Sequence, residues 1–548
     1  MDGWPVFRMS DDTLGHINES LEITNIGEND VRSEIIEYLT VRQQRRWIFP
    51  RAALVGAIAG LVALLFRIAL VSADSWRSAL GMWAYQHPGY GWLIMALCTL
   101  IGAGVSVAIT RKFAPDAAGS GIPHLEAVLY RFRKLDAKRV LPVKFFGGIL
   151  AIGTGMALGR EGPTVQMGGS VGDLVARLLK VSDRERLTLI SAGAGAGLAA
   201  AFNAPLSGLI FVLEEVRRDF QPIVFGAAFI AAVIADIVAR MGSGQFPVFS
   251  VPAYPVPPLS SLPVFAVLGI TAGLLGVLFN KVLLFSLNTY GRIPSRYRIP
   301  AAAITGGLIG LAGWFSPILI GSGHSLAETA MQGELALGII PIFFILRFAL
   351  TSASYGTGAP GGIFAPLLVL GSLIGLGIGQ VAHILMPDVV PIPAAFAVVG
   401  MAAYFTAIVR APLTGVMLII EMTGNYSQML PLLVSCFCAY IVAEGLKDLP
   451  IYEALLERDL RKTGDSSFMK TPAVMEFIIQ DKAPFAGRKV SELGLPAGCI
   501  LVRCEDGKRE WVPKANTRLE AHMRITAVVA PDAKDGLNII RRGCGIIS

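Results

Sequence analysis

Glu161 is the one acidic residue in a stretch of the sequence that is mostly glycyl and apolar. It lies in the segment GREGP at residues 159–163, directly after Arg160. A carboxylate in such surroundings must either find an anion-binding nest or take up a proton. An ion pair with Arg160 explains it poorly, because adjacent residues on a helix point apart. The residue types therefore indicate anion binding and proton movement at one position.

A second acidic pair, Glu214 and Glu215, follows the uncharged tract 187–213 and precedes Arg217 and Arg218. Its structural interpretation is a helix that leaves an apolar region, with Glu214 paired to an arginine at i+3 or i+4. Composition alone favours that interpretation over a role in proton transfer.

Three segments, one of which contains Glu161, combine a glycine-rich turn, a closing proline and an apolar helical pattern. They are GSGIP at 119–123, GREGP at 159–163 and GIFAP at 362–366. Their prolines fit the first position of a helix, where an N–H is not needed. The free N–H groups and the dipole at such helix starts can hold an anion without a full basic charge. The alternative is that Gly and Pro only allow interrupted helices to pack.

The composition requires these segments to lie in a membrane protein. Of 548 residues, 53% are hydrophobic and 16% are charged, and the mean hydropathy is +0.60, whereas about a quarter of the residues of a soluble chain are charged. The tracts without Asp, Glu, Lys or Arg include 78–110, 187–213, 241–280 and 348–387. Each exceeds the roughly 20 residues that span a bilayer. We therefore expect a polytopic membrane protein and not a soluble enzyme.

The charge distribution predicts the orientation of the chain. The net charge is +7, but basic residues cluster where apolar tracts begin or end, at 42–51 and 131–139, which argues against nucleic-acid binding and makes these ends cytoplasmic. The uncharged connections 82–90 and 242–263 should face outward. No apolar signal segment occurs in residues 1–25, so both termini are expected in the cytoplasm. The six cysteines show no spacing typical of disulfides or zinc sites, and we expect no metal and no cofactor.

An internal repeat divides the apolar region into two halves. FAPDAAGSGIPHLEA at 113–127 matches 315–329, and GREGPTVQMGGSVG at 159–172 matches 362–375. The third block, 193–214, matches 400–421, so the offsets are 202, 203 and 207. Such halves are typical of secondary transporters and related channels, whose substrate site lies at the repeat interface. We expect a cytoplasmic segment at 1–50, membrane halves at 51–256 and 257–458, and a cytosolic domain at 459–548.

The three glycine motifs, with AAFNAPLSGLIFVLEE at 200–215, resemble those of the CLC family of chloride channels and chloride/proton exchangers over about residues 50–458. This resemblance implies an all-α polytopic fold of two inverted halves with tilted and interrupted helices. It further implies a homodimer with one pore in each subunit, and it points to the inner membrane of a bacterium.

The resemblance also assigns anion-binding residues. Ser120 and Tyr452 match the family's two hydroxyl ligands of a central anion, although a lone Ser in a membrane helix usually packs and a lone Tyr is usually an interfacial anchor. The backbone N–H groups of Ile363 and Phe364 would complete the central site. Those around Arg160 and Gly162 would form an outer site.

The same resemblance assigns three acidic residues. Glu161 matches the gate, which competes with the anion when ionised, swings away when protonated, and serves as the external proton acceptor. Glu215 matches the acid that delivers protons from the cytoplasm in the exchangers. Glu126 matches another buried acid, to which we give a structural role.

The tail beyond Phe468 has a different composition. Short β-rich segments occur at 473–480, 499–506 and 524–530 between charged turns, which predicts a small α+β domain. Residues 483–513 resemble the C-terminal subdomain of RCK-type regulators. Sensing of a small-molecule ligand, stabilisation of a dimer and a passive cap stay open. The N-terminal segment contains a helical pattern at 30–46.

Several other classes of protein fit less well. A potassium channel would need a TVGYG-like filter, which TSASYGTG at 351–358 is not. A serine protease would have to pair the GSG serine with His124 or His324, and no motif does so. Fluoride is disfavoured as the main substrate, because fluoride-exporting relatives usually lack Ser in the GSGIP segment. We therefore expect chloride/proton exchange with a glutamate gate, and a passive voltage- or ligand-gated chloride channel on the same fold is the alternative.

Overall fold

The computed structural model describes residues 28–218, 220–245, 247–463, 473–481, 483–506, 509–530, 533 and 536–545. Within these ranges, the side chains of 28–46, 461–463, 473–474 and 537–538 are not described. The first 27 residues of the expected N-terminal segment therefore lie outside the described part of the chain.

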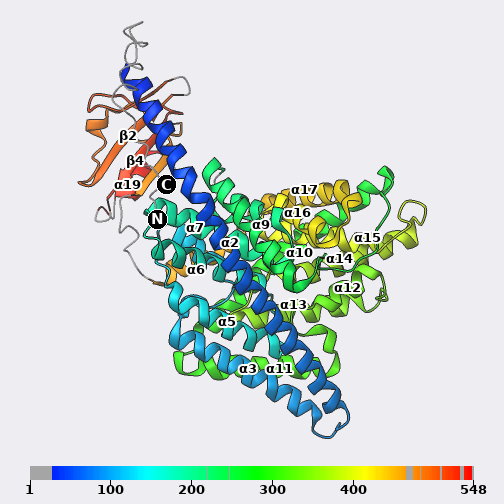
Figure 1. Ribbon diagram of the computed structural model, residues 1–548. Helices are drawn as coiled ribbons and strands as arrows, with labels where there is room; N and C mark the ends of the chain where they lie inside the picture. Colours follow the sequence, from blue (N-terminus) through cyan, green and yellow to red (C-terminus); the bar gives the residue numbers. More distant parts are fainter. Residues whose placement is uncertain are drawn as a thin grey trace, which may run out of the picture.

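The membrane part is built from helices of very unequal length (Figure 1). The first eight α-helices are α2 (Glu28–Tyr85), α3 (Gly91–Phe113), α4 (Ile122–Leu129), α5 (Ala137–Thr154), α6 (Glu161–Leu178), α7 (Asp183–Phe202), α8 (Pro205–Phe211) and α9 (Pro222–Ser243). The next nine are α10 (Leu262–Arg292), α11 (Arg298–Phe315), α12 (His324–Gln332), α13 (Ile340–Gly356), α14 (Phe364–Leu385), α15 (Ala395–Val409), α16 (Pro412–Thr423), α17 (Met429–Gly445) and α18 (Ile451–Thr463). Seven helical segments among the described residues are long and apolar enough to cross a membrane. The helical pattern predicted at 30–46 is part of α2.

Short one-turn segments and a π-helical turn connect or extend these helices. The 3-10 turns are η1 (Pro115–Ala117), η3 (Leu259–Ser261), η4 (Ser295–Tyr297), η5 (Pro317–Leu319) and η6 (Tyr426–Gln428), and the π-helical turn is η2 (Val212–Val216), which continues α8. A π-turn widens the helix locally and is frequent at functional sites.

The helix boundaries follow the sequence repeat. The offsets 202, 203 and 207 separate the first residues of α4 and α12, of α6 and α14, and of α8 and α16. Close helix contacts are repeated as well. A Cβ atom on Gly168 of α6 would lie 2.1 Å from the carbonyl oxygen of Gly193 in α7, and one on Gly371 of α14 would lie 2.4 Å from that of Gly400 in α15. Glycine is required at both crossings because the backbones touch, which is a common way of packing membrane helices.

Two glutamates at equivalent repeat positions connect the halves. Glu421 on α16 accepts hydrogen bonds from the N–H groups of Leu206 and Ser207 at the start of α8, at 3.0 and 2.8 Å. Glu214 on η2 accepts them from Leu413 and Thr414 at the start of α16, at 3.1 and 2.7 Å. Each carboxylate also accepts a bond from the hydroxyl of the second residue of its pair. We call these contacts the glutamate clasp.

The clasp changes the interpretation of the Glu214–Glu215 segment. From the sequence, Glu214 is the residue expected to pair with an arginine three or four positions later, but its carboxylate caps a helix of the other half. An i,i+3 ion pair does form at this helix end, between Glu215 and Arg218 at 3.5 Å. The sequence alone does not reveal the distant amides, because they lie about 200 residues away.

The tail forms a four-stranded antiparallel sheet and one helix. The strands are β1 (Ala473–Ile478), β2 (Cys499–Glu505), β3 (Glu510–Trp511) and β4 (Arg524–Val529), in the order β1-β4-β2-β3, and the helix is α19 (Gly536–Gly543). The three predicted strands are confirmed, and β3 was not predicted. Cys499, Cys504 and Cys544 are buried free thiols in this domain, and burial raises the pKa of Cys544 to about 11, so its reactive thiolate is scarce at neutral pH.

We predict that Glu421→Ala destabilises the protein. The substitution leaves two helix-start N–H groups and the hydroxyl of the buried residue Ser207 without their acceptor, which costs about 1–3 kcal/mol. Thermal unfolding in detergent should show a lower midpoint than for the parent. Glu334→Ala, at an exposed position, serves as the control. Equal losses in both variants would contradict the stabilising role of the clasp.

Candidate anion-binding site

The loops that carry the three glycine motifs meet at one backbone junction between the halves. Gly159 and Gly362 exchange hydrogen bonds, with N···O distances of 2.7 and 2.8 Å. Gly119 donates to Ala359 at 3.2 Å and accepts a bond from Gly361 at 3.0 Å. Segments more than 200 residues apart therefore satisfy each other's backbone groups at the point where their helices are interrupted.

Three helices begin at this junction, at Ile122, Glu161 and Phe364. The prediction that each motif's proline occupies the first helical position is wrong by one or two residues, because these helices start before their prolines. The physical argument holds, since every proline still lies in the first turn, where backbone N–H groups have no intrahelical acceptor and the missing N–H of proline costs no hydrogen bond. The helix starts thus present their free N–H groups at the junction.

The hydroxyls of Ser120 and Tyr452 are buried and unpaired. Both residues are almost inaccessible, at 1% and 0%, and neither oxygen has a hydrogen-bond partner among the described residues. A Cβ atom on Gly162 would lie 2.4 Å from the Ser120 Oγ atom, so the backbone of the second motif passes directly beside this hydroxyl. Because an unpaired buried hydroxyl is costly, these groups suit a ligand that accepts hydrogen bonds.

Glu161 is the first residue of α6, and its side chain is 3% exposed. Its Oε2 atom accepts a hydrogen bond from the N–H of Ala365, in the first turn of α14, at 3.3 Å. The carboxylate therefore occupies a position at a helix start that suits an anion. The sequence argument against an Arg160–Glu161 pair is wrong, because Arg160 Nε lies 3.9 Å from Glu161 Oε1. Arg160 is the N-cap residue of α6, and its long side chain reaches the adjacent carboxylate although neighbouring helical residues usually point apart.

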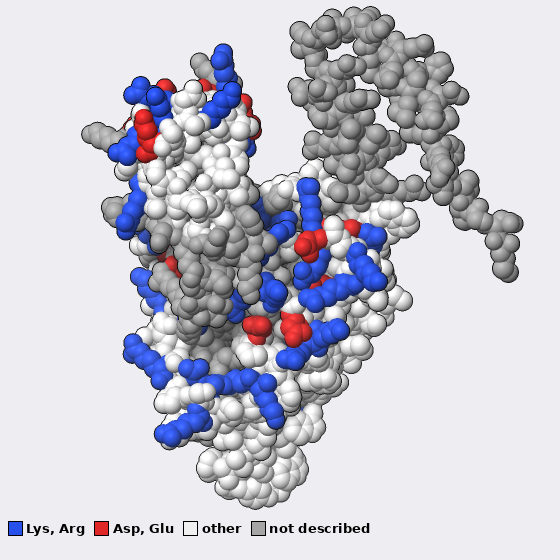
Figure 2. Space-filling model, turned by 90° about the vertical axis from the view of Figure 1, so that its left-hand side faces the viewer, with Lys and Arg blue, Asp and Glu red and all other residues white. Residues whose placement is uncertain are grey.

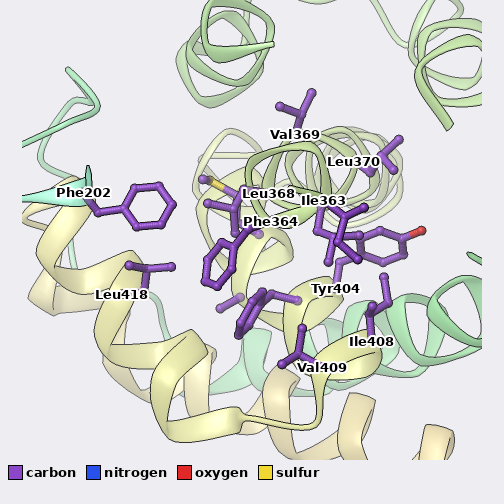
Figure 3. Close-up of a cluster of buried hydrophobic side chains, with 14 of the residues drawn as sticks. Phe202, Ile363, Phe364, Leu368, Val369, Leu370, Tyr404, Ile408, Val409 and Leu418 are labelled. Atoms are coloured by element: carbon purple, nitrogen blue, oxygen red, sulfur yellow. The ribbon is translucent and has the colours of Figure 1, made fainter. Parts of the chain in front are cut away.

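The side chains of Ile363 and Phe364 anchor the start of α14 in the core, so their N–H groups are fixed at the junction (Figure 3). The Phe364 ring centroid lies 4.4 Å from that of Phe405 and 5.4 Å from that of Phe202. Aromatic packing of this kind holds a helix start in place.

Sequence reasoning missed two buried cations at equivalent repeat positions, Lys144 and Arg347. Lys144 Nζ donates to the carbonyl oxygens of Ala117 and Gly119, at 2.9 and 2.6 Å. Arg347 donates to those of Leu319 and Gly321, both at 2.7 Å. Each cation therefore holds the turn before a Gly-Ser-Gly segment and places positive charge close to it. The usable signal was a basic residue in each half, 203 positions apart, in a mostly apolar segment.

A cavity of about 380 Å³ touches Gly119 and Gly121, which flank Ser120. Its lining includes the four arginines Arg111, Arg133, Arg298 and Arg458 and the two acids Asp116 and Asp459. A cavity with an excess of cations raises the local concentration of anions. The basic residues are thus placed to attract anions toward the junction.

Glu215 and Glu126, the other two acidic residues assigned from the sequence, lie on different elements. Glu215 is on η2, is 2% exposed, and lines a separate cavity of about 510 Å³. Glu126 is on α4 and is equally buried. The Oε1 atoms of both residues have no hydrogen-bond partner in the described structure.

Interrupted helices in two repeated halves, helix starts that meet at one junction, and buried hydroxyls without protein partners are features of a class of membrane proteins that transport anions. The chain belongs to the voltage-gated chloride channel family, whose model matches residues 102–444. A protein of Vibrio parahaemolyticus named H(+)/Cl(-) exchange transporter ClcA is 43% identical over 420 residues, which are 75% of this chain and 89% of the relative. A Salmonella paratyphi A protein with the same name is 39% identical over 418 residues, 75% of this chain and 88% of the relative.

Solved structures support the same family. A crystal structure described as a slow cyanobacterial Cl-/H+ antiporter is 39% identical, with a TM-score of 0.74. The match covers 76% of this chain and 99% of that one. The tail matches the TrkA-C domain model over residues 474–535, which confirms the resemblance to the C-terminal subdomain of RCK-type regulators.

We predict that Gly162→Ala weakens chloride binding. The new methyl group would lie 2.4 Å from Ser120 Oγ and 2.9 Å from its carbonyl oxygen, and such overpacking costs about 1–3 kcal/mol. If the strain displaces Ser120, the dissociation constant for chloride should rise roughly tenfold, as measured by titration calorimetry. Gly338→Ala, where a Cβ meets no atom within 4 Å, should bind like the parent. A normal affinity of the Gly162 variant would contradict this placement of the site.

Proposed function

We propose that the protein exchanges chloride for protons across the membrane, with Glu161 as the gate. The observation that carries this proposal is that the buried Glu161 carboxylate accepts a hydrogen bond from the N–H group of Ala365. The next residue, Gly162, lies directly beside Ser120. A negative group held at a helix start inside the protein occupies the kind of position that a chloride ion would take.

Chloride binds between the helix starts. The hydroxyls of Ser120 and Tyr452 donate hydrogen bonds to a central ion, and the N–H groups of Ile363 and Phe364 complete its shell. An outer ion binds at the N–H groups around Arg160 and Gly162. The unpaired hydroxyls and the arginine-lined cavity support this assignment, since a desolvated anion needs donors on several sides.

Glu161 couples chloride movement to proton movement, because its carboxylate competes with chloride for the outer site. As an anion it holds the outer site and excludes chloride. When it takes up a proton, it loses its attraction for the helix start, swings away and lets chloride enter. Proton uptake and chloride passage thus alternate at a single group.

Glu215 supplies protons from the cytoplasmic side. Its burial and its place beside a second cavity support a proton route apart from the arginine-lined entrance. The names of the relatives from Vibrio and Salmonella support exchange over passive conduction.

The protein works in the inner membrane of a bacterium, as a homodimer with one pore in each subunit and both termini in the cytoplasm. Lys and Arg predominate over Asp and Glu on the face shown in Figure 2, which fits a cytoplasmic surface. The TrkA-C domain is proposed to sense a small-molecule ligand.

Proton flux in liposomes tests the exchange. A chloride gradient should drive protons uphill through the parent, and both Glu161→Gln and Glu215→Gln should reduce that flux roughly 100-fold, because a positioned acid or base contributes about that factor or more. Chloride should still pass through Glu215→Gln. Chloride flux without coupled protons in the parent would make the protein a passive channel and leave Glu215 with the structural ion pair to Arg218.

A further inference from the structure

One of the carboxylates that line the cavity beside Glu215 is that of Glu453, next in the chain to Tyr452. The Glu453 side chain is 36% exposed, whereas that of Glu215 is 3% exposed. Cytoplasmic water therefore reaches one carboxylate freely and the other hardly at all. A proton that passes from the cytoplasm to Glu215 must therefore move from an accessible region into a buried one.

One guanidinium lies between the two carboxylates. Arg218 forms a hydrogen-bonded ion pair with Glu453 Oε1, and its Nη2 atom lies 3.5 Å from Glu215 Oε1. The Arg218 backbone has a φ of +51°, a conformation that non-glycine residues rarely adopt. This rare backbone conformation occurs at the residue that bridges an accessible and a buried acid.

Other charged groups of the cavity have different roles. Glu214 is held by the N–H groups at the start of α16. Arg410 lies 3.8 Å from Glu444 and 3.9 Å from Asp448. Glu214 thus belongs to the clasp, and Glu444 and Asp448 contact Arg410.

Two further titratable groups, Tyr440 and Lys447, line the cavity. Glu126, Tyr130 and Tyr452 are not part of its lining but interact electrostatically with Glu215. Arg218 remains the cation that contacts both Glu215 and Glu453.

We propose that Glu453 relays protons from the cytoplasm to Glu215 and that Arg218, as their shared counter-ion, positions both. This inference rests on the proposed use of Glu215 in proton transport. Glu453 takes a proton from water, and water in the cavity carries that proton to the Glu215 carboxylate. The O–H bond on Glu453 breaks as one forms on Glu215, so the charge of the trio does not change. Because Arg218 contacts both carboxylates, it can remain paired with whichever one is ionised.

The test measures chloride-driven proton flux and chloride flux for the full chain in liposomes, with the same pH on both sides, over a range of pH. Glu453→Gln should lower proton flux roughly 10- to 100-fold and lower the number of protons moved per chloride. Its loss of proton flux should become larger as the pH rises, because direct protonation of Glu215 from water becomes rarer. Glu453→Asp should restore part of the flux. Arg218→Gln should displace the pH profile upward, since loss of a cation favours the protonated acids.

Glu444→Gln is the matched control. This residue lines the same cavity and is 63% exposed, but its ion pair is with Arg410, so its variant should couple like the parent. Normal coupling in Glu453→Gln, or equal losses in Glu453→Gln and Glu444→Gln, would overturn the relay. An unchanged pH profile in Arg218→Gln would overturn the role of the counter-ion. If the parent moves no coupled protons, the proposed exchange itself fails. If Glu215→Gln still couples, the assigned role of Glu215 fails, and the relay fails with it.

Discussion

Helices that stop inside a bilayer leave N–H and C=O groups that lipid cannot satisfy, and this constraint governs the whole membrane part. Each half supplies hydrogen-bond partners for the interrupted helices of the other half. The pairs Gly159–Gly362 and Gly119–Gly361 join the interrupted segments of one half to those of the other. The glutamate clasp does the same for α8 and α16. The groups left unpaired at the junction are then those that a ligand can use, above all the hydroxyl of Ser120.

Much of this architecture was predictable from the sequence, because the motifs and the repeat are local patterns. Glycine-rich turns closed by proline predicted the helix starts to within two residues, and the three block offsets recur in the helix boundaries. The strands of the tail are short segments rich in β-branched and apolar residues between charged turns, which short windows detect. Strand β3 contains only Glu510 and Trp511 and is too short to leave such a pattern.

The contacts of individual charges were much less predictable. Glu214 finds its partners on α16, and Arg218 finds Glu453 on α18, so sequence spacing gave no sign of either contact. Arg160 reaches Glu161 through its long side chain, whose conformation residue types do not encode. Long-range pairing in a membrane depends on which apolar faces meet, and many arrangements bury similar area.

The clasp also bears on how such a chain could arise. Glu421 caps the helix of the first half and Glu214 caps that of the second. A half-length chain on its own would keep the glutamate and the helix start but would lack the other copy's version of each. It could satisfy both by pairing with a second copy of itself about a two-fold axis, so that each copy's glutamate caps the other copy's helix start. Duplication followed by fusion would then place both glutamates and both helix starts in one chain and make the pairing independent of protein concentration.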